Sequence, residues 1–435
     1  MTAIRQRDRD AVVQSLRAGV VPRVGQHLIQ VGRSLELETL IKDIERIANG
    51  GSTFRLIIGE YGSGKTFFLN LVRAVALEKK LVAISADLNP DRRLHSTSGQ
   101  ARSLYAELMK NISTRTKPDG NGMSAIVEKF MTTVITEAKA TNLKPDEVMN
   151  RKLEQLSDMV NGYDFATVIS AYWKGFETGD EQMKATAIRW LRGEFQTKTD
   201  ARQALNVRTI IDDASFYDQL KLLAKFVRLA GFSGLIVCLD ELVNLYKLAN
   251  SQARNANYEQ ILRILNDSLQ GSAEGIGFIL GGTPEFVLDT RRGLYSYQAL
   301  QSRLAENAFA KNGLVDMTGP LLRLANLSHE EFYELLRKLR HVYAFGETSK
   351  YLLPDEALVA FMEHCHNKIG EAYFRTPRTT ITAFINLLAV LEQNPTANWK
   401  ELLCQVVVEN KPEESAPVGA AEASDDTDEL TKFKL

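Results

Sequence analysis

Residues Gly59-Glu60-Tyr61-Gly62-Ser63-Gly64-Lys65-Thr66 fit the phosphate-binding pattern G-x-x-x-x-G-K-[ST] at every fixed position. The apolar residues 54–58 before this stretch predict a strand, and residues 67–77 after it predict a helix. The three glycines allow the backbone to wrap around phosphate oxygens with its N–H groups pointing inward, and the helix N-terminus adds partial positive charge. The stretch therefore predicts a strand–loop–helix unit that binds a nucleotide, with contacts from Gly59 through Phe67.

Two side chains of this loop have separate predicted roles. Lys65 is expected to reach the β- and γ-phosphates of the nucleotide, whereas the Thr66 hydroxyl is expected to be a magnesium ligand. The alternative is a glycine turn that carries a lysine by chance, but the strand and helix on either side favour the phosphate loop.

A second stretch carries two acids at the end of a strand. Residues 234–239 are continuously apolar, as is typical of a central parallel strand covered on both faces, and they end at Asp240 and Glu241. Asp240 is predicted to hold magnesium through water, and Glu241 to orient and polarise the attacking water. An apolar run ending in Asp-Glu is a weak signal alone, but together with a phosphate loop it indicates a Walker B motif. The alternative is a helix N-cap pair.

The remaining pattern predicts an α/β fold with a parallel sheet. Apolar runs at 81–86, 276–280 and 321–327 predict three further strands among helix-like segments. Residues 114–205 differ, because helix-like segments at 124–139, 146–161 and 181–195 follow a Pro- and Gly-containing break without convincing strands. We interpret them as a helical insertion that either covers the sheet or offers a partner surface.

The predicted domain organisation follows from these segments. We expect an N-terminal arm with its helix at 1–50, a P-loop ATPase core at 51–113 and 206–327, the insertion at 114–205, a helical lid at 328–405 and a disordered acidic tail at 411–435.

Composition narrows the class of protein. The 435 residues include 53 basic and 54 acidic side chains, so the chain has no global electrostatic footprint for nucleic acid or an anionic membrane, although a local basic face remains open. The first residues lack the apolar core of a signal peptide, and no apolar run reaches the roughly 18 residues of a membrane span. The distant cysteines Cys238, Cys365 and Cys404 indicate reduced core residues of a cytoplasmic protein.

With these motifs in order, the chain resembles AAA+ P-loop ATPases of the origin-recognition and STAND-like side, and more narrowly the bacterial BREX system ATP-binding protein (BrxD-like) family. The stretches that carry the resemblance are Gly19-Val20-Val21-Pro22, Gly59–Thr66, Asp87-Leu88-Asn89-Pro90, Arg92-Arg93-Leu94, Asp240-Glu241-Leu242 and Arg291-Arg292-Gly293-Leu294-Tyr295-Ser296-Tyr297. The Walker motifs identify only the superfamily, and the narrower resemblance comes from the other stretches. It implies a three-layer αβα sheet with a C-terminal lid, in a cytoplasmic ATPase of a multi-gene anti-phage defence system.

The AAA+ resemblance also implies roles for residues outside the Walker motifs. The entry segment at 19–33, which leads into a predicted helix at 34–48, is expected to pack beside the adenine; the alternative is a simple N-terminal arm. Thr283 follows the strand at 276–280 and corresponds to the sensor-1 side chain, which bonds the water or the γ-phosphate; the alternative is a turn residue before Pro284.

The AAA+ resemblance also implies roles for two arginines. Arg303, in Ala299-Leu300-Gln301-Ser302-Arg303, resembles the arginine finger offered to the ATP of a neighbouring subunit, with Arg291 and Arg292 as rivals. Arg378 resembles the sensor-2 arginine that reads the γ-phosphate from the lid. The alternatives are a surface-helix arginine and a plain N-terminal helix arginine, respectively.

The predicted function is an ATPase that uses ATP and Mg²⁺ and couples hydrolysis to remodelling of a DNA-associated defence complex. The implied partners are other defence proteins, including a DNA methyltransferase, and further copies of the chain in an ATP-dependent homo-oligomer. Two alternatives stay open: a binding switch in which ATP holds the lid closed with little hydrolysis, and a DNA-loading protein whose affinity for duplex falls steeply with salt.

Overall fold

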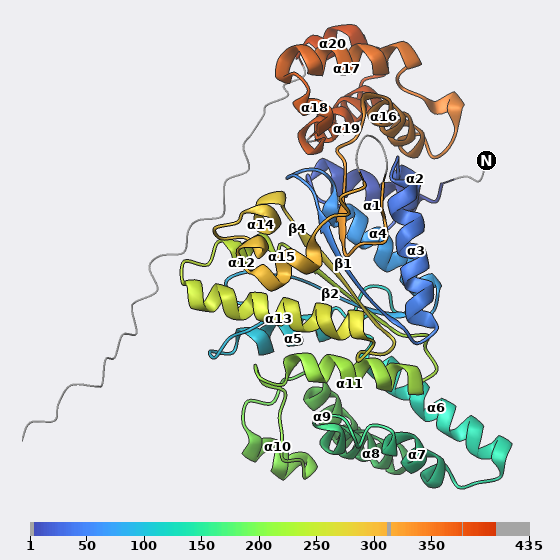
Figure 1. Cartoon of the computed structure of the whole chain (residues 1–435). Helices are drawn as coiled ribbons and strands as arrows, with labels where there is room; N and C mark the ends of the chain where they lie inside the picture. The colour runs from blue at the N-terminus through green and yellow to red at the C-terminus, as the bar shows by residue number, and fades with distance from the viewer. Residues whose placement is uncertain (1–3, 311–314, 376, 406–435) are drawn as a thin grey trace, which may run out of the picture.

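The computed structural model describes residues 4–310, 315–375 and 377–405 (Figure 1). Five strands form one sheet in the order β2-β3-β4-β1-β5, and every neighbouring pair is parallel. The strands are β1 (Ser52–Ile58), β2 (Val82–Asp87), β3 (Leu235–Asp240), β4 (Ile276–Gly282) and β5 (Leu321–Arg323). The predicted α/β class and parallel sheet are confirmed, whereas the last strand ends at 323 rather than at the expected 327.

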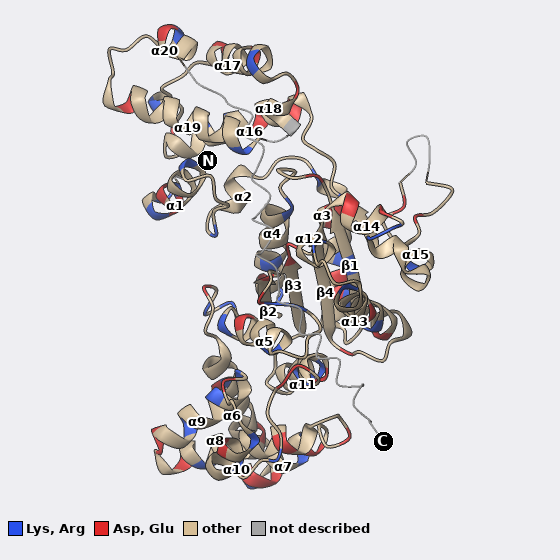
Figure 2. Cartoon of the chain, turned by 90° about the vertical axis from the view of Figure 1, so that its left-hand side faces the viewer, with Lys and Arg blue, Asp and Glu red and all other residues tan. Residues whose placement is uncertain are grey.

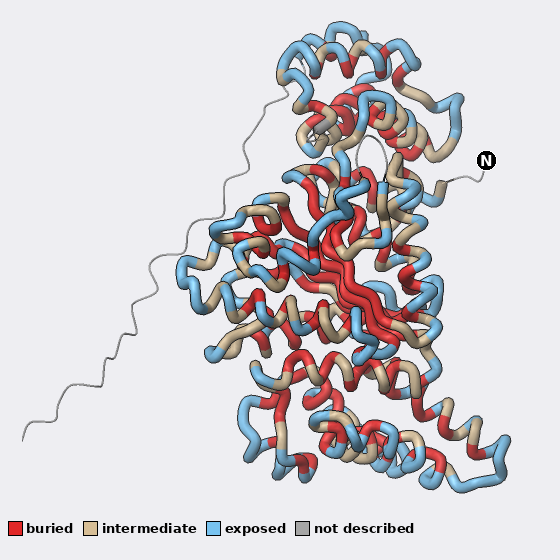
Figure 3. Tube along the Cα trace, viewed as in Figure 1, coloured by how far each residue is buried: buried red, intermediate tan, exposed pale blue. Residues whose placement is uncertain are grey.

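Different helices cover the two faces of the sheet. Successive side chains of a strand point to opposite faces, so alternate residues of each strand pack against different helices. On one face, Ile57, Ile236 and Ile279 pack against α3 and α4. On the other face, Leu56 and Phe278 belong to a core shared with α5, α11 and α13. Figure 3 shows the strands as the most continuous buried part of the chain. The helices around the sheet are α3 (Ser34–Ala48), α4 (Lys65–Glu78), α5 (Gln100–Lys110), α11 (Phe216–Leu229), α12 (Val243–Tyr246), α13 (Ser251–Gln270), α14 (Pro284–Leu288), the 3-10 helix η1 (Leu294–Ser296) and α15 (Gln298–Leu304).

Between α5 and α11 the chain forms a group of helices at the end of the molecule farthest from the C-terminal helices (Figure 1). They are α6 (Met123–Thr141), α7 (Pro145–Glu154), α8 (Gly162–Thr178), α9 (Glu181–Leu191) and α10 (Lys198–Leu205). Their core is continuous with that of the sheet, since the Phe226 ring of α11 lies 5.0 Å from Phe130 and 5.3 Å from Phe165. The helix expected over 146–161 ends at residue 154, and a turn precedes Gly162, where a Cβ would collide with the Leu156 carbonyl oxygen.

The last helices form a bundle with a hydrophobic core of its own. They are α16 (His329–Tyr343), α17 (Asp355–Ile369), α18 (Ala372–Arg375), α19 (Arg378–Gln393) and α20 (Trp399–Gln405), with the 3-10 helix η2 (Thr348–Lys350) before α17. The N-terminal α1 (Gln6–Arg17) and α2 (Gln26–Ile29) join this bundle, where Val12, Val13 and Ile29 are buried in its core, and both views place α1 beside α19 (Figures 1 and 2). We call α1, α2 and α16–α20 the terminal bundle. The expected acidic tail lies outside the described residues.

No helix within the described ranges is long and apolar enough to cross a membrane. Figure 2 shows acidic and basic residues interspersed along the helices, as the balanced composition indicates.

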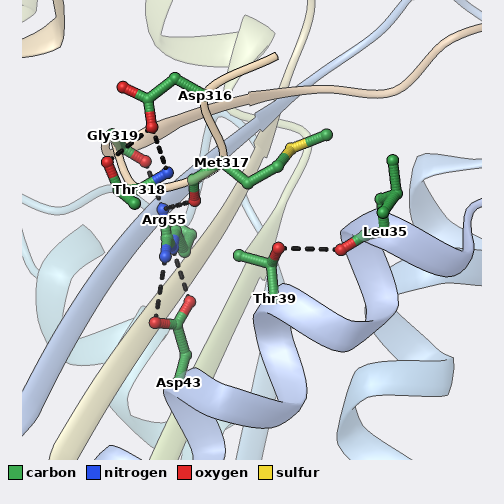
Figure 4. Close-up of polar contacts among 8 residues, drawn as sticks. All are labelled: Leu35, Thr39, Asp43, Arg55, Asp316, Met317, Thr318 and Gly319. Carbon is green, nitrogen blue, oxygen red and sulfur yellow. Dashed lines mark hydrogen bonds and ion pairs between the residues drawn. The ribbon is translucent and has the colours of Figure 1, made fainter. Parts of the chain in front are cut away.

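A buried ion pair joins β1 to α3, and the same arginine also binds the segment that leads into β5 (Figure 4). Arg55 on β1 donates from Nε to Asp43 Oδ2 on α3 at 2.5 Å and from Nη2 to Asp43 Oδ1 at 3.1 Å. Its Nη1 donates to the carbonyl oxygens of Met317, at 2.9 Å, and Gly319. Both charged side chains are buried, and the Asp43 carboxylate has its charge compensated by Arg55.

Replacing Arg55 with Ala is therefore expected to lower the free energy of unfolding by about 3–5 kcal/mol, because the Asp43 carboxylate would stay buried without its partner. Urea denaturation measures the change. The double variant Arg55→Met, Asp43→Leu keeps the volume and removes both charges, so it is expected to lose less. Equal losses in the single and double variants would contradict this account.

Candidate nucleotide-binding site

The candidate site begins where β1 ends, at the carboxyl edge of the sheet. The Gly59 N–H donates to the Gly282 carbonyl oxygen of β4 at 3.3 Å, which fixes the start of the loop. Gly62 and Gly64 have φ values of 75° and 81°, in the left-handed region that favours glycine. The chain then enters α4 directly at Lys65, so the helix N-terminus faces the loop.

Lys65 lies over the carbonyl oxygens of its own loop. Its Nζ donates to Gly59 and Glu60, at 2.8 Å each, and lies 5.6 Å from the centre of the Tyr61 ring. The Glu60 carboxylate points elsewhere and accepts from Asn326 Nδ2 at 3.2 Å. The ammonium is thus already held at the loop, where it can meet phosphate oxygens.

Two oxygens with the chemistry of magnesium ligands lie together beside the loop. Thr66 Oγ1 donates to Asp240 Oδ2 at 2.6 Å, so α4 and the end of β3 meet at this point. Carboxylate and hydroxyl oxygens suit Mg²⁺, which usually takes its remaining ligands from phosphates and water. The residues present therefore fit a magnesium–nucleotide site.

Three carboxylates gather at the ends of β2 and β3. Asp87 pairs in register with Asp240, and Glu241 follows Asp240 with a left-handed φ of 58°. The Glu241 N–H donates to Asp240 Oδ1 at 2.9 Å. Burial, and then the charge of Asp240, raise the pKa of Glu241 and also that of Asp87. A cation beside these carboxylates would reduce the repulsion among them.

A cleft of about 190 Å³ opens above the loop, between the sheet and the terminal bundle. Lys65, Thr66, Asp240 and Glu241 line its sheet side. An apolar part is built by the N-terminal segment and by the bundle, and its lining side chains are Leu16, Val20, Val21, Pro22, Ile29, Val31, Leu327, Leu335 and Ile381. Its chemistry suits a flat aromatic base, and its walls include residues from the segment expected beside the adenine.

Of the further candidates, Thr283 and Arg378 line the same cleft. Thr283 is 2 % exposed, and its Oγ1 has no hydrogen-bond partner within the part of the chain that the structure describes. A buried hydroxyl of this kind generally has a partner, so a polar ligand atom or water would satisfy it. Arg378 reaches the cleft from the N-terminus of α19, in the bundle.

The arginine-finger candidates lie on another part of the surface. Arg303 is exposed on α15, with Nε donating to Asn266 Oδ1 at 2.6 Å and Nη1 to the Ala299 carbonyl at 2.9 Å. Arg292 donates to the carbonyl oxygens of Tyr246 and Leu248, at 2.7 and 2.8 Å, which is a structural role. Arg291 is exposed.

Arg33 is expected from the sequence only as part of the segment beside the adenine, with no role predicted for its side chain. Its guanidinium lines the cleft and donates to the carbonyl oxygens of Ser63, Gly64 and Ala325. Burial lowers the pKa of Arg33, although the negative charges of Glu36 and Glu331 act to raise it. The sequence places this arginine only at the start of a helix, and no local pattern indicates that it contacts a loop thirty residues later.

Comparison with known proteins agrees with this geometry. A search of curated proteins finds no matching relative. The family model of the BREX system ATP-binding protein BrxC/D matches residues 4–406, which includes the sheet, the cleft and the terminal bundle. The chain therefore belongs to the BREX system ATP-binding protein BrxC/D family.

Proposed function

We propose that this protein is an AAA+-type ATPase that couples ATP binding and hydrolysis to conformational change in a BREX defence complex. Family membership supports ATP as the ligand and other BREX components as partners. The observation that carries the proposal of hydrolysis is the pairing of Asp240 with Thr66 at 2.6 Å, with Glu241 directly beside it in the same cleft. A site for binding alone has no need of a second carboxylate next to the metal ligand.

Each residue has a proposed task. Lys65 and the loop amides bind and orient the phosphates, and Thr66 and Asp240 hold Mg²⁺, which neutralises phosphate charge when bound. Glu241 orients the attacking water and accepts hydrogen bonds from it, a task that its raised pKa favours because a more basic carboxylate is the better acceptor. Thr283 offers its unpaired hydroxyl to the water or the γ-phosphate.

The conformational part of the proposal concerns the bundle. Arg378 belongs to α19 and lines the cleft from the side opposite the loop. An arginine in this position can bond the γ-phosphate while ATP is present and lose that contact after hydrolysis. We therefore propose that the terminal bundle acts as a lid whose position depends on the nucleotide.

Measuring phosphate release from ATP by the purified protein, with magnesium and with a chelator, tests the function. We expect turnover with magnesium and none with the chelator. Tight ATP binding with no phosphate release, under conditions that include the partner proteins and DNA, would contradict hydrolysis.

The exposed position of Arg303 leads to a separate prediction. Replacing Arg303 with Ala is expected to keep ATP affinity within about 3-fold and to lower turnover by at least about 100-fold, because its guanidinium would act on the ATP of a neighbouring copy. Arg263→Ala is the control, since Arg263 is another partly exposed arginine, on α13, that pairs with Asp218. Unchanged turnover, or turnover per molecule that is independent of protein concentration in a proven monomer, would count against a finger at Arg303.

A further inference from the structure

The first helix of the chain is a structural part of the terminal bundle. The Arg9 guanidinium of α1 lies 4.5 Å from the centre of the Tyr343 ring and pairs with Glu392 of α19 at 3.1 Å. The Leu16 carbonyl accepts a hydrogen bond from Thr382 Oγ1 at 3.0 Å. These contacts, with the buried Val12 and Val13, mean that α1 moves with the bundle rather than with the sheet.

Two segments consequently join the bundle to the sheet. Residues 30–33, which we call the strap, run from α2 along the cleft to α3, and residues 324–328, which we call the hinge segment, run from β5 to α16. The strap is pinned to α16, because Lys338 Nζ donates to the Gln30 carbonyl and a Cβ at Gly32 would collide with the Glu331 carboxylate. Any movement of the bundle over the nucleotide must bend both segments.

Arg33 is where the strap, the hinge segment and the phosphate loop meet. Its Nη2 donates to the carbonyl oxygen of Ser63 in the loop and, at 3.4 Å, to that of Ala325 in the hinge segment. Its Nη1 lies 3.5 Å from the Gly64 carbonyl oxygen. One rigid, planar guanidinium thus contacts both the loop that holds phosphate and a segment that holds the bundle.

The two loop carbonyls matter because of peptide geometry. In a planar trans peptide the C=O of one residue and the N–H of the next point in opposite directions. By holding the carbonyls of Ser63 and Gly64, Arg33 turns the N–H groups of Gly64 and Lys65 away from itself and fixes two peptide planes of the phosphate loop. Arg33 has itself a left-handed backbone, with φ 61° and ψ 31°, which a non-glycine residue rarely adopts without a compensating role.

We propose that Arg33 is a positioning residue that presets the phosphate loop and couples its occupancy to the hinge of the terminal bundle. When phosphate binds the loop amides, the peptide planes of residues 63–65 tighten, and the guanidinium carries this change to Ala325. When the loop is empty, the same contacts loosen together. The inference rests on the proposed function only in that ATP occupies the cleft, and it requires no hydrolysis.

The test combines nucleotide affinity with hydrogen–deuterium exchange of the full-length protein, using the slowly hydrolysed analogue ATPγS with magnesium. The variants are Arg33→Ala, Arg33→Lys and, as a control, Arg337→Ala, since Arg337 is an exposed arginine of α16 whose pairing with Glu334 stays within that helix. In the wild type we expect ATPγS to slow exchange in the loop, the strap and the hinge segment.

Arg33→Ala is expected to bind ATPγS roughly 10- to 100-fold more weakly, because the loop loses the hydrogen bonds that preset it. In this variant, saturating ATPγS should still slow hydrogen exchange in the loop but should no longer slow it in the hinge segment. Arg33→Lys should be intermediate, since an ammonium cannot reach three carbonyls in one plane, and Arg337→Ala should match the wild type.

Two results would overturn the proposal: a wild type whose hinge segment does not respond to ATPγS, or an Arg33→Ala variant that responds as the wild type does. If thermal melting shows that Arg33→Ala is unfolded, the Arg33→Lys variant replaces it in the test. A response of its hinge segment to ATPγS equal to that of the wild type would then overturn the proposal. A wild type that shows the coupled protection but never hydrolyses ATP would refute the proposed ATPase and leave this inference standing, so the two failures are distinguishable.

Discussion

Replacing Lys65 with Ala is expected to weaken ATP binding by about 100- to 1,000-fold and to abolish measurable turnover. Lys65 Nζ is already held at the loop by the carbonyl oxygens of Gly59 and Glu60, so the wild type needs little reorganisation to meet the phosphates. Hydrogen bonds to charged groups contribute about 1.5–3 kcal/mol each, and the loss of two of them at the lower end of this range, about 3–4 kcal/mol together, corresponds to this loss of affinity. Isothermal titration with ATP and magnesium measures the loss.

Lys79→Ala is the matched control, because Lys79 caps the other end of the same helix and pairs with Glu45 at the surface. Its affinity should equal that of the wild type. Should Lys65→Ala bind ATP as tightly as Lys79→Ala while both melt at the wild-type temperature, the loop would not be the phosphate site.

Replacing Glu241 with Gln is expected to lower turnover by about 100- to 10,000-fold while ATP affinity changes less than about 3-fold. The amide keeps the size of the side chain but cannot accept a proton from water, and general-base catalysis contributes factors of this size. A further effect favours tight binding, since Gln removes one of three neighbouring negative charges beside the phosphates. Single-turnover phosphate release and equilibrium titration separate the two quantities.

Glu274→Gln is the control for this variant. Glu274 is exposed just before β4 begins, at the edge of the sheet away from the cleft, and pairs with Lys225 at 3.6 Å. If the wild type and Glu241→Gln bind ATP equally and neither releases phosphate, the enzyme interpretation fails and the ATP-gated binding switch is the better account.

The sheet and the phosphate loop could be predicted because their signals are local. The loop between β1 and α4 depends on glycines and a lysine at fixed spacing, and β3 is a buried run that ends in acids. Strands that are parallel bring their carboxyl ends to one edge, so the meeting of Thr66 and Asp240 follows from the fold class itself. At these positions the local sequence pattern favours the same structure that the whole fold requires.

The rest depends on contacts between distant residues. Nothing near Val12 indicates that α1 packs in a bundle with α16 and α19, and nothing near Arg33 indicates its bonds to the loop and to Ala325. The helix expected over 146–161 was too long because the apolar pattern continues through the turn before Gly162. The roles of Thr283, Arg303 and Arg378 stay predictions, and the Arg303→Ala variant tests the second of them.

The place of α1 in the terminal bundle has a consequence for how the protein is made. Arg9 and its partner Tyr343 are 334 residues apart in the chain. At about 5–20 residues per second, the ribosome needs roughly 15–70 s to deliver α16 after α1 has emerged. During that time the apolar side of α1, with Val12 and Val13, has no partner helix, while the sheet can already fold. The cleft is therefore completed only after α19 has been synthesised, so a chain cut short before α19 would carry the phosphate loop without the bundle side chains that line the other side of the cleft.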